Sequence, residues 1–149
     1  MSGVARCAPV LATALLLAAT ACAGDDATRV VLTADDCVYE GAGSVDAGTV
    51  AIDLENESGE VGVFELLRLD PAGTDEELEA YVTAEQERID AGAAPQGTPG
   101  FATSVVQPVV EPGETGTLTA GLTAARYAIL CSNGEPAASI HATASFEVT

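Results

Sequence analysis

The chain contains no lysine, so every one of its few basic residues is an arginine. Five basic residues stand against 23 acidic ones, which gives a formal net charge of −18 at pH 7. A surface this acidic repels nucleic acid and anionic lipid headgroups, whereas it favours solubility and can attract cations or basic partners. The charge balance therefore argues against nucleic acid as a partner.

Histidine is also scarce, since it occurs once, at position 141. No G-x-S-x-G segment surrounds any serine of the chain, and there is no second histidine to orient or share a base role. No pair of carboxylates has a reason to be buried together as acid and base. No glycine-rich phosphate loop or dinucleotide fingerprint is present in the sequence. We therefore expect that the protein is not an enzyme, and that a lone histidine such as His141 is a packed or surface residue.

The N-terminus lacks an apolar run long enough to span a bilayer. Arg6 is the only charged residue in the first 24, and the apolar stretch runs only from Val10 to Ala21. A helix needs about 20 apolar residues to cross a hydrocarbon core of ~30 Å. A weakly basic start followed by a short apolar core and small residues is typical of an export signal.

The small residues ATA (19–21) stand directly before Cys22. This arrangement resembles a bacterial lipoprotein signal, which is cut just before a cysteine that then carries the lipid (palmitate in such proteins). We predict a lipoprotein signal peptide at 1–21, a lipidated tether at 22–28 and one domain at 29–149. The protein is then expected at the extracytoplasmic face of the cell membrane, held by the lipid on Cys22. The alternative is an ordinary secreted protein cut after Ala21 or Ala23.

Short segments of strand-like composition alternate with turn signals along the domain. Asn and Gly in N-E-S-G-E (56–60), and Pro and Gly in E-P-G-E (111–114), mark two of the turns. The strand candidates are 29–33, 37–39, 50–54, 61–69, 101–110, 115–120, 125–131 and 140–148. Six or more short strands with turns between them predict an all-β sandwich. Within 101–110, Pro108 allows at best an edge strand.

One helix is predicted within this β pattern, at about 75–91. Thr74 and Glu77 form a capping box, and acidic residues fill the first turn, where the helix dipole favours negative charge. Gly92 ends the helix, with Pro95 soon after it. Four apolar residues repeat with the helical period and should pack on the sheet: Leu78, Tyr81, Val82 and Ile89.

Three segments carry a resemblance to a known family. They are TADDCVYEGAGSVDAGTVAIDLENES (33–58), VFELL (63–67) and EPGETGTLTAGLTAARYAILCSNG (111–134). In their order and spacing they resemble the cupredoxin-like domains of exported actinobacterial lipoproteins. They are also similar to the N-terminal cupredoxin domain of periplasmic iron-uptake proteins of the Efe type. The resemblance covers roughly 30–70 and 108–148, and it implies a cupredoxin-like Greek-key β-sandwich in which 74–92 is an insertion.

The resemblance also allows a type-1 copper site to be assessed. Such a site uses two histidines, a cysteine thiolate and a weak axial ligand. Of this set only Cys131 is present, and His141 lies four residues past the place implied for the second histidine. The positions implied for the two histidines and the axial methionine hold residues that cannot ligate: Gly62 or Val63, Ala137 after Pro136, and Ala142. We therefore expect no type-1 copper.

Cys7 leaves with the predicted signal peptide and Cys22 carries the lipid, so two cysteines remain. Cys37 and Cys131 face an oxidising compartment, where thiols that meet usually form a disulfide. The Efe-type resemblance implies an alternative, a copper or iron site that uses Cys37, Cys131 and Glu65, with Asp35, Asp36 or His141 as additional ligands. Two unpaired buried thiols are the third alternative. The sequence leaves these three open.

The sequence thus predicts a lipid-anchored, extracytoplasmic binding or interaction module that has no resident cofactor. Its ligand is not identified, and an envelope protein or a cation are both conceivable partners. The alternative is a module that handles copper or iron through Cys37, Cys131 and Glu65.

Overall fold

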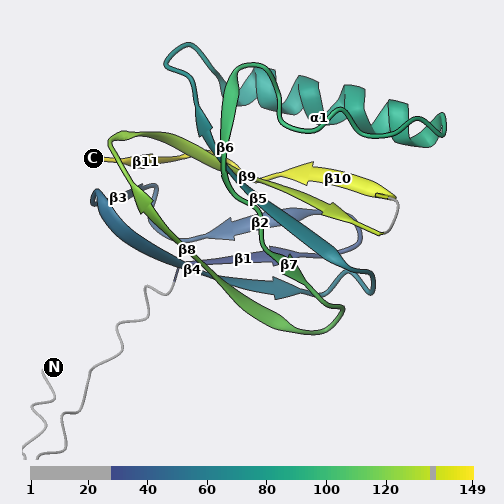
Figure 1. The fold of residues 1–149 in the computed structure, drawn as a ribbon, viewed down its shortest axis with the longest axis horizontal. Helices are drawn as coiled ribbons and strands as arrows, with labels where there is room; N and C mark the ends of the chain where they lie inside the picture. The colour runs from purple at the N-terminus through teal and green to yellow at the C-terminus, as the bar shows by residue number, and fades with distance from the viewer. Residues whose placement is uncertain (1–27, 135–136) are drawn as a thin grey trace, which may run out of the picture.

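The computed structural model describes residues 28–134 and 137–149, which form two β-sheets packed face to face (Figure 1). The predicted signal peptide and nearly all of the predicted tether lie outside these residues. The first sheet has the order β2 (Cys37–Glu40), β1 (Arg29–Leu32), β4 (Gly48–Asn56) and β8 (Thr115–Leu122). No helix in the part of the chain that the structure describes is long and apolar enough to cross a membrane.

The second sheet carries the remaining strands. Its order is β3 (Ser44–Val45), β11 (Phe146–Val148), β9 (Ala125–Asn133), β5 (Gly62–Leu69) and β6 (Ala102–Val106). Two short strands extend it, because β10 (Ser139–Ala142) pairs with β9 and β7 (Val109–Val110) pairs with β5. Pairing is antiparallel except between β1 and β4 and between β3 and β11. This arrangement confirms the prediction of an all-β sandwich.

Two of the predicted strands are each divided into two. The segment 101–110 forms β6 and β7 on either side of Pro108, which has no N–H to give to a ladder. The predicted single strand 140–148 was wrong, since it forms β10 and β11 with a break at 143–145. At the break, two hydrogen bonds of Thr143 take the place of regular strand pairing with β9. The Thr143 N–H donates to the Ile129 carbonyl (2.9 Å), and the Thr143 hydroxyl accepts the Ile129 N–H (3.0 Å).

The main hydrophobic core lies between the two sheets. The side chains that point inward from both sheets are almost fully buried there, as the alternation of β-strands requires. They include Val30, Leu32, Ile52, Leu54, Phe64, Leu66, Leu118, Ile129, Phe146 and Val148.

The inserted helix α1 (Asp75–Asp90) covers the outer face of the second sheet (Figure 1). Its N-terminus is the predicted capping box, in which the Thr74 hydroxyl accepts the Glu77 N–H and the Glu77 carboxylate accepts the Thr74 N–H. Gly92 follows the helix with φ +78°, a conformation that glycine adopts without strain. The four predicted residues of the helix face pack with Leu67, Leu130 and Ile140 in a second hydrophobic cluster.

Candidate functional site

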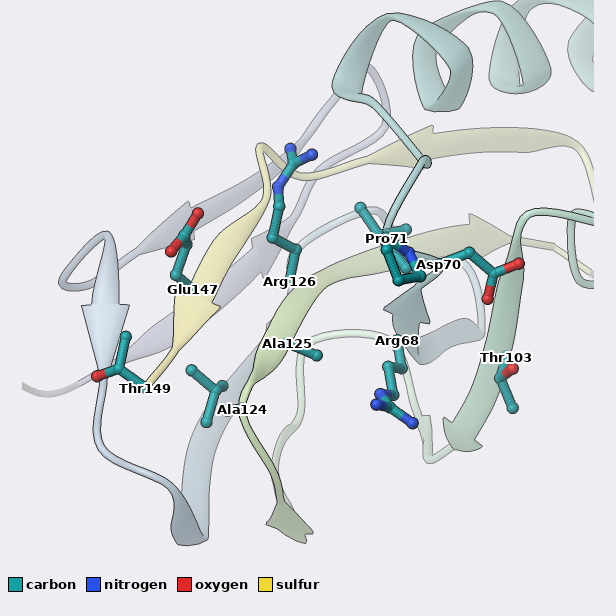
Figure 2. Close-up of a pocket in the computed structure, with 11 residues that line it drawn as sticks. Arg68, Asp70, Pro71, Thr103, Ala124, Ala125, Arg126, Glu147 and Thr149 are labelled. Carbon is teal, nitrogen blue, oxygen red and sulfur yellow. The ribbon is translucent and has the colours of Figure 1, made fainter.

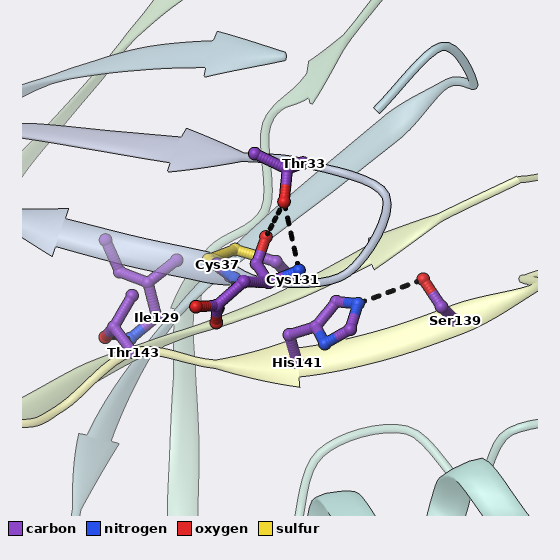
Figure 3. Close-up of a disulfide and its surroundings, with 8 residues drawn as sticks. Thr33, Cys37, Ile129, Cys131, Ser139, His141 and Thr143 are labelled. Atoms are coloured by element: carbon purple, nitrogen blue, oxygen red, sulfur yellow. Dashed lines mark hydrogen bonds between the residues drawn. A yellow bond between two sulfur atoms is a disulfide. The ribbon is translucent and has the colours of Figure 1, made fainter. Parts of the chain in front are cut away.

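Cys37 and Cys131 form a disulfide that links the two sheets through the core (Figure 3). Cys37 begins β2 in the first sheet, whereas Cys131 lies within β9 in the second. Both cysteines are buried in the main core, and their Cα atoms are 6.2 Å apart. Of the three alternatives that the sequence leaves open for these cysteines, the structure shows the disulfide.

Glu65 points away from this disulfide. In the antiparallel pairing of β5 with β9, Phe64 lies opposite Cys131, and Glu65 lies opposite Leu130. Neighbouring side chains of a strand point to opposite faces, so Glu65 shares the face of Leu130, which packs under the helix. The structure therefore does not bring Cys37, Cys131 and Glu65 together as the three ligands of one metal ion.

Glu65 instead helps to hold the loop that follows the helix. Its Oε1 accepts the hydroxyl of Thr98 at 2.6 Å, and the side chain is almost fully buried. Glu85 of α1 is also buried, accepts the N–H of Gln96 at 2.6 Å and forms an ion pair with Arg88 at 3.3 Å. Two buried carboxylates, one from the sheet and one from the helix, thus fix the loop at 94–98.

Tyr81 also contacts this loop, because it donates its hydroxyl hydrogen to the carbonyl of Gly97. Burial, followed by the negative charges of Glu85 and Glu65, raises the pKa of Tyr81 to about 12, and Arg88 opposes this in part. The hydroxyl of Tyr81 therefore keeps its proton, and its hydrogen bond to the loop, far above neutral pH.

This raised pKa predicts a loss of stability at alkaline pH. In the unfolded chain tyrosine titrates near pH 10, so between about pH 10 and 12 the folded state binds the proton that the unfolded state releases. The free energy of unfolding should therefore decrease across this range. Urea denaturation at several pH values from 9 to 12 should show a shallower decrease for Tyr81→Phe than for the wild type. Equal slopes for the two proteins would contradict the assignment.

His141 lies on β10 opposite Cys131 of β9, so the imidazole is beside the disulfide (Figure 3). The disulfide occupies both sulfurs, and the Nε2 atom of His141 is 3.2 Å from the hydroxyl of Ser139. Across residues 28–134 and 137–149, no group of three or more His, Cys, Asp or Glu is arranged to hold a metal ion.

Gly62, one of the two positions implied for the first copper histidine, is closed by packing. A Cβ atom on Gly62 would lie 2.9 Å from the Asn56 Nδ2 and 2.9 Å from a Leu32 methyl carbon. Asn56 is itself buried and donates to the carbonyls of Glu60 and Val110. Gly62 is therefore required at this place by its neighbours. Pro136, which the sequence analysis used to place the second histidine, lies outside the described residues.

A pocket of about 600 Å³ lies at one end of the sandwich (Figure 2). The ends of β5 and β11 and the starts of β6 and β9 surround it. Leu69, Pro71, Ala124, Ala125 and Val148 supply apolar surface to its walls. The charged residues at the pocket are Arg68, Asp70, Arg126 and Glu147.

The two arginines of the pocket differ in their contacts. Arg126 is held by an ion pair with Asp75 at 3.0 Å and by hydrogen bonds to the Gly73 carbonyl at 2.9 Å and the Ser145 hydroxyl at 2.6 Å. These contacts join the start of the helix to the second sheet. Arg68 is exposed, and Figure 2 shows its side chain between Ala124 and Ala125 on one side and Thr103 on the other.

This pocket was not predicted from the sequence. Arg68 and Arg126 are far apart in the chain, and no short pattern marks either of them. The one signal in the sequence is the small number of basic residues. The chain has only five, and two of them line this pocket.

No protein-family model matches the chain, and no curated protein matches it. Solved structures that match the chain include auracyanin A from Chloroflexus aurantiacus, a "blue" copper protein. It has 16% identity and a TM-score of 0.45, and the match covers 81% of this chain and 96% of that one. Auracyanin B has 20% identity and a TM-score of 0.42, covering 81% and 86%. An azurin from Methylomonas sp. strain J has 13% identity and a TM-score of 0.39, covering 82% and 96%. These matches are a similarity only, and the resemblance to the cupredoxin-like domains of actinobacterial lipoproteins and to Efe-type proteins stays a prediction.

Proposed function

We propose that this protein is a lipid-anchored, extracytoplasmic binding module without type-1 copper, and that it binds a small molecule in the pocket at Arg68. The pocket is the observation that carries the proposal. Its volume of about 600 Å³ falls within the range of small-molecule sites, which are mostly apolar with a few polar groups that orient the ligand. Its walls combine apolar residues with polar groups that can orient a ligand, among them Arg68 and Thr103.

The lipid anchor in this proposal rests on the sequence around Cys22. The absence of type-1 copper rests on the residues that replace its ligands, and the packing around Gly62 supports it. The copper or iron module built on Cys37, Cys131 and Glu65 gains no support from the geometry, because a disulfide joins the cysteines and Glu65 lies on the other face of the sheet. We therefore propose no resident metal.

The test uses the mature chain with Cys22→Ser, which lacks the lipid but keeps every described residue. Its ¹H–¹⁵N NMR spectrum is recorded with a set of small apolar-bodied compounds that are anionic, cationic or neutral. We expect at least one compound to shift the resonances of Arg68, Thr103 and Ala125. If no compound shifts them, the binding proposal fails.

A comparison of the wild type with Cys22→Ser tests the lipid anchor by detergent phase separation. The mature wild type should enter the detergent phase because of its acyl chains, whereas Cys22→Ser should stay in the aqueous phase. Partition of both proteins into the aqueous phase would contradict lipidation and leave the binding test unaffected.

A further inference from the structure

Arg68 differs from every other arginine that the structure describes. Arg29 is paired with Glu40 at 2.6 Å, and the other two form ion pairs with Glu85 and Asp75. The side chain of Arg68 forms no ion pair or hydrogen bond with any residue in 28–134 or 137–149, although the chain has 23 acidic residues. Such a cation, in so acidic a chain, is available for a ligand.

The register of β5 places Arg68 beside a hydroxyl that can also donate a hydrogen bond to an anion. Arg68 lies opposite Tyr127 of β9 and opposite Thr103 of β6, so its side chain shares the face of both. The hydroxyl of Thr103 has no hydrogen-bond partner in the described part of the chain, and it lines the same pocket. Arginine donates in a planar fork that matches a carboxylate, and such charge-assisted hydrogen bonds are stronger than neutral ones.

The remaining walls restrict what the ligand can carry. Pro71, Ala124, Ala125 and Val148 offer small or apolar surface, which suits a hydrocarbon body. Asp70 lines the same pocket and would repel a second negative charge, and the net charge of −18 already repels multiply charged anions in general. These features favour a single carboxylate over a phosphate dianion or a dicarboxylate.

We propose that the pocket binds a small organic monocarboxylate with an apolar body, with the carboxylate on the Arg68 guanidinium and the Thr103 hydroxyl. This inference rests on the proposed binding function and specifies the chemical class of its ligand. The apolar body lies against Pro71, Ala125 and Val148.

Three six-carbon probes test the class of ligand: hexanoate, hexanol and hexylamine. Each is titrated into the Cys22→Ser mature chain, and binding is followed by the NMR shifts of Thr103 and Ala125. Hexanoate should bind about tenfold or more tightly than hexanol, as expected for a charge-assisted hydrogen bond. Hexylamine should bind more weakly than hexanoate.

Matched variants assign the effect to one side chain. Arg68→Gln should weaken hexanoate binding about tenfold and leave hexanol binding unchanged, whereas Arg68→Lys should keep part of the preference because it keeps the charge. Arg29→Gln removes an arginine that does not line the pocket and should change nothing. Because Arg68 is exposed and unpaired in the described structure, its variants should melt like the parent protein.

The outcomes separate the two proposals. Binding of hexanol or hexylamine at the pocket as tight as that of hexanoate would overturn the carboxylate class and leave the binding module intact. The same holds if Arg68→Gln binds hexanoate as well as the parent protein does. If none of the three probes shifts the pocket resonances, the monocarboxylate proposal fails, and the broader set of compounds described above still decides the binding function.

Discussion

Replacing both cysteines of the disulfide by serine is expected to lower the free energy of unfolding by about 4–5 kcal/mol. The bridge joins residues 94 apart in sequence, and it closes a loop that contains most of the domain. In the chain-entropy model, removing so long a cross-link returns a large conformational freedom to the unfolded chain. The core also loses a covalent link between its two sheets at a site where both side chains are buried.

Urea denaturation of Cys37→Ser/Cys131→Ser, compared with the parent protein, measures this loss. Both proteins should carry Cys22→Ser, so that neither the lipid nor a third thiol affects the comparison. The parent protein with a dithiol reductant is a second route to the same state and should give a similar loss. A decrease below about 1 kcal/mol would show that the sandwich does not depend on this bridge.

Replacing Asn56 by alanine is expected to lower the free energy of unfolding by about 2–4 kcal/mol, although Asn56 is the last residue of β4 and touches no proposed ligand. The side chain is 1% exposed. Its Nδ2 donates to the carbonyls of Glu60 and Val110, at 2.7 and 2.8 Å, and its Oδ1 accepts from the N–H and the hydroxyl of Ser58, at 3.1 and 2.7 Å. Alanine would remove all four hydrogen bonds and leave the buried Val110 carbonyl without this donor.

Two variants make the test specific. Asn56→Asp has nearly the same shape, but it loses both N–H donors and places a negative charge beside two carbonyls, so it should destabilise at least as much as alanine at neutral pH. Glu57→Ala changes the exposed neighbour and should have an effect within about 0.5 kcal/mol. Thermal and urea denaturation at pH 7 provide the measurement. If Asn56→Ala behaved like Glu57→Ala, the hydrogen-bond network would have no part in stability.

The local elements of the fold could be predicted from the sequence because their signals are local. The helix, predicted at about 75–91, is Asp75–Asp90, since its capping box and its apolar face each lie within a few residues. The division of the last strand could not be predicted, because Thr143 bonds to Ile129 on a strand that is distant in sequence. Glu85 falls on the same helix face as Leu78, but nothing in the sequence shows that Gln96 would satisfy a buried carboxylate there.

Only part of the candidate site could be predicted, because most of it depends on contacts between residues that are distant in sequence. The compartment and the few cysteines indicated that Cys37 and Cys131 could pair, and the structure confirms the disulfide. The face on which Glu65 lies depends on the register of β5 against β9, which no single strand reveals. The pocket at Arg68 depends on four strand ends that meet in space, so only the folded structure shows it.

The position of the pocket has a consequence for how its ligand would arrive. Figure 1 shows the start of β1 and the end of β11 at the same end of the sandwich, and Val148 and Thr149 line the pocket there. Even fully extended, the chain from Cys22 to Thr28 reaches only about 20 Å. With the lipid on Cys22, the pocket would lie close to the bilayer surface, where an apolar carboxylate accumulates. The ligand would then reach the pocket from the membrane surface as well as from the surrounding water.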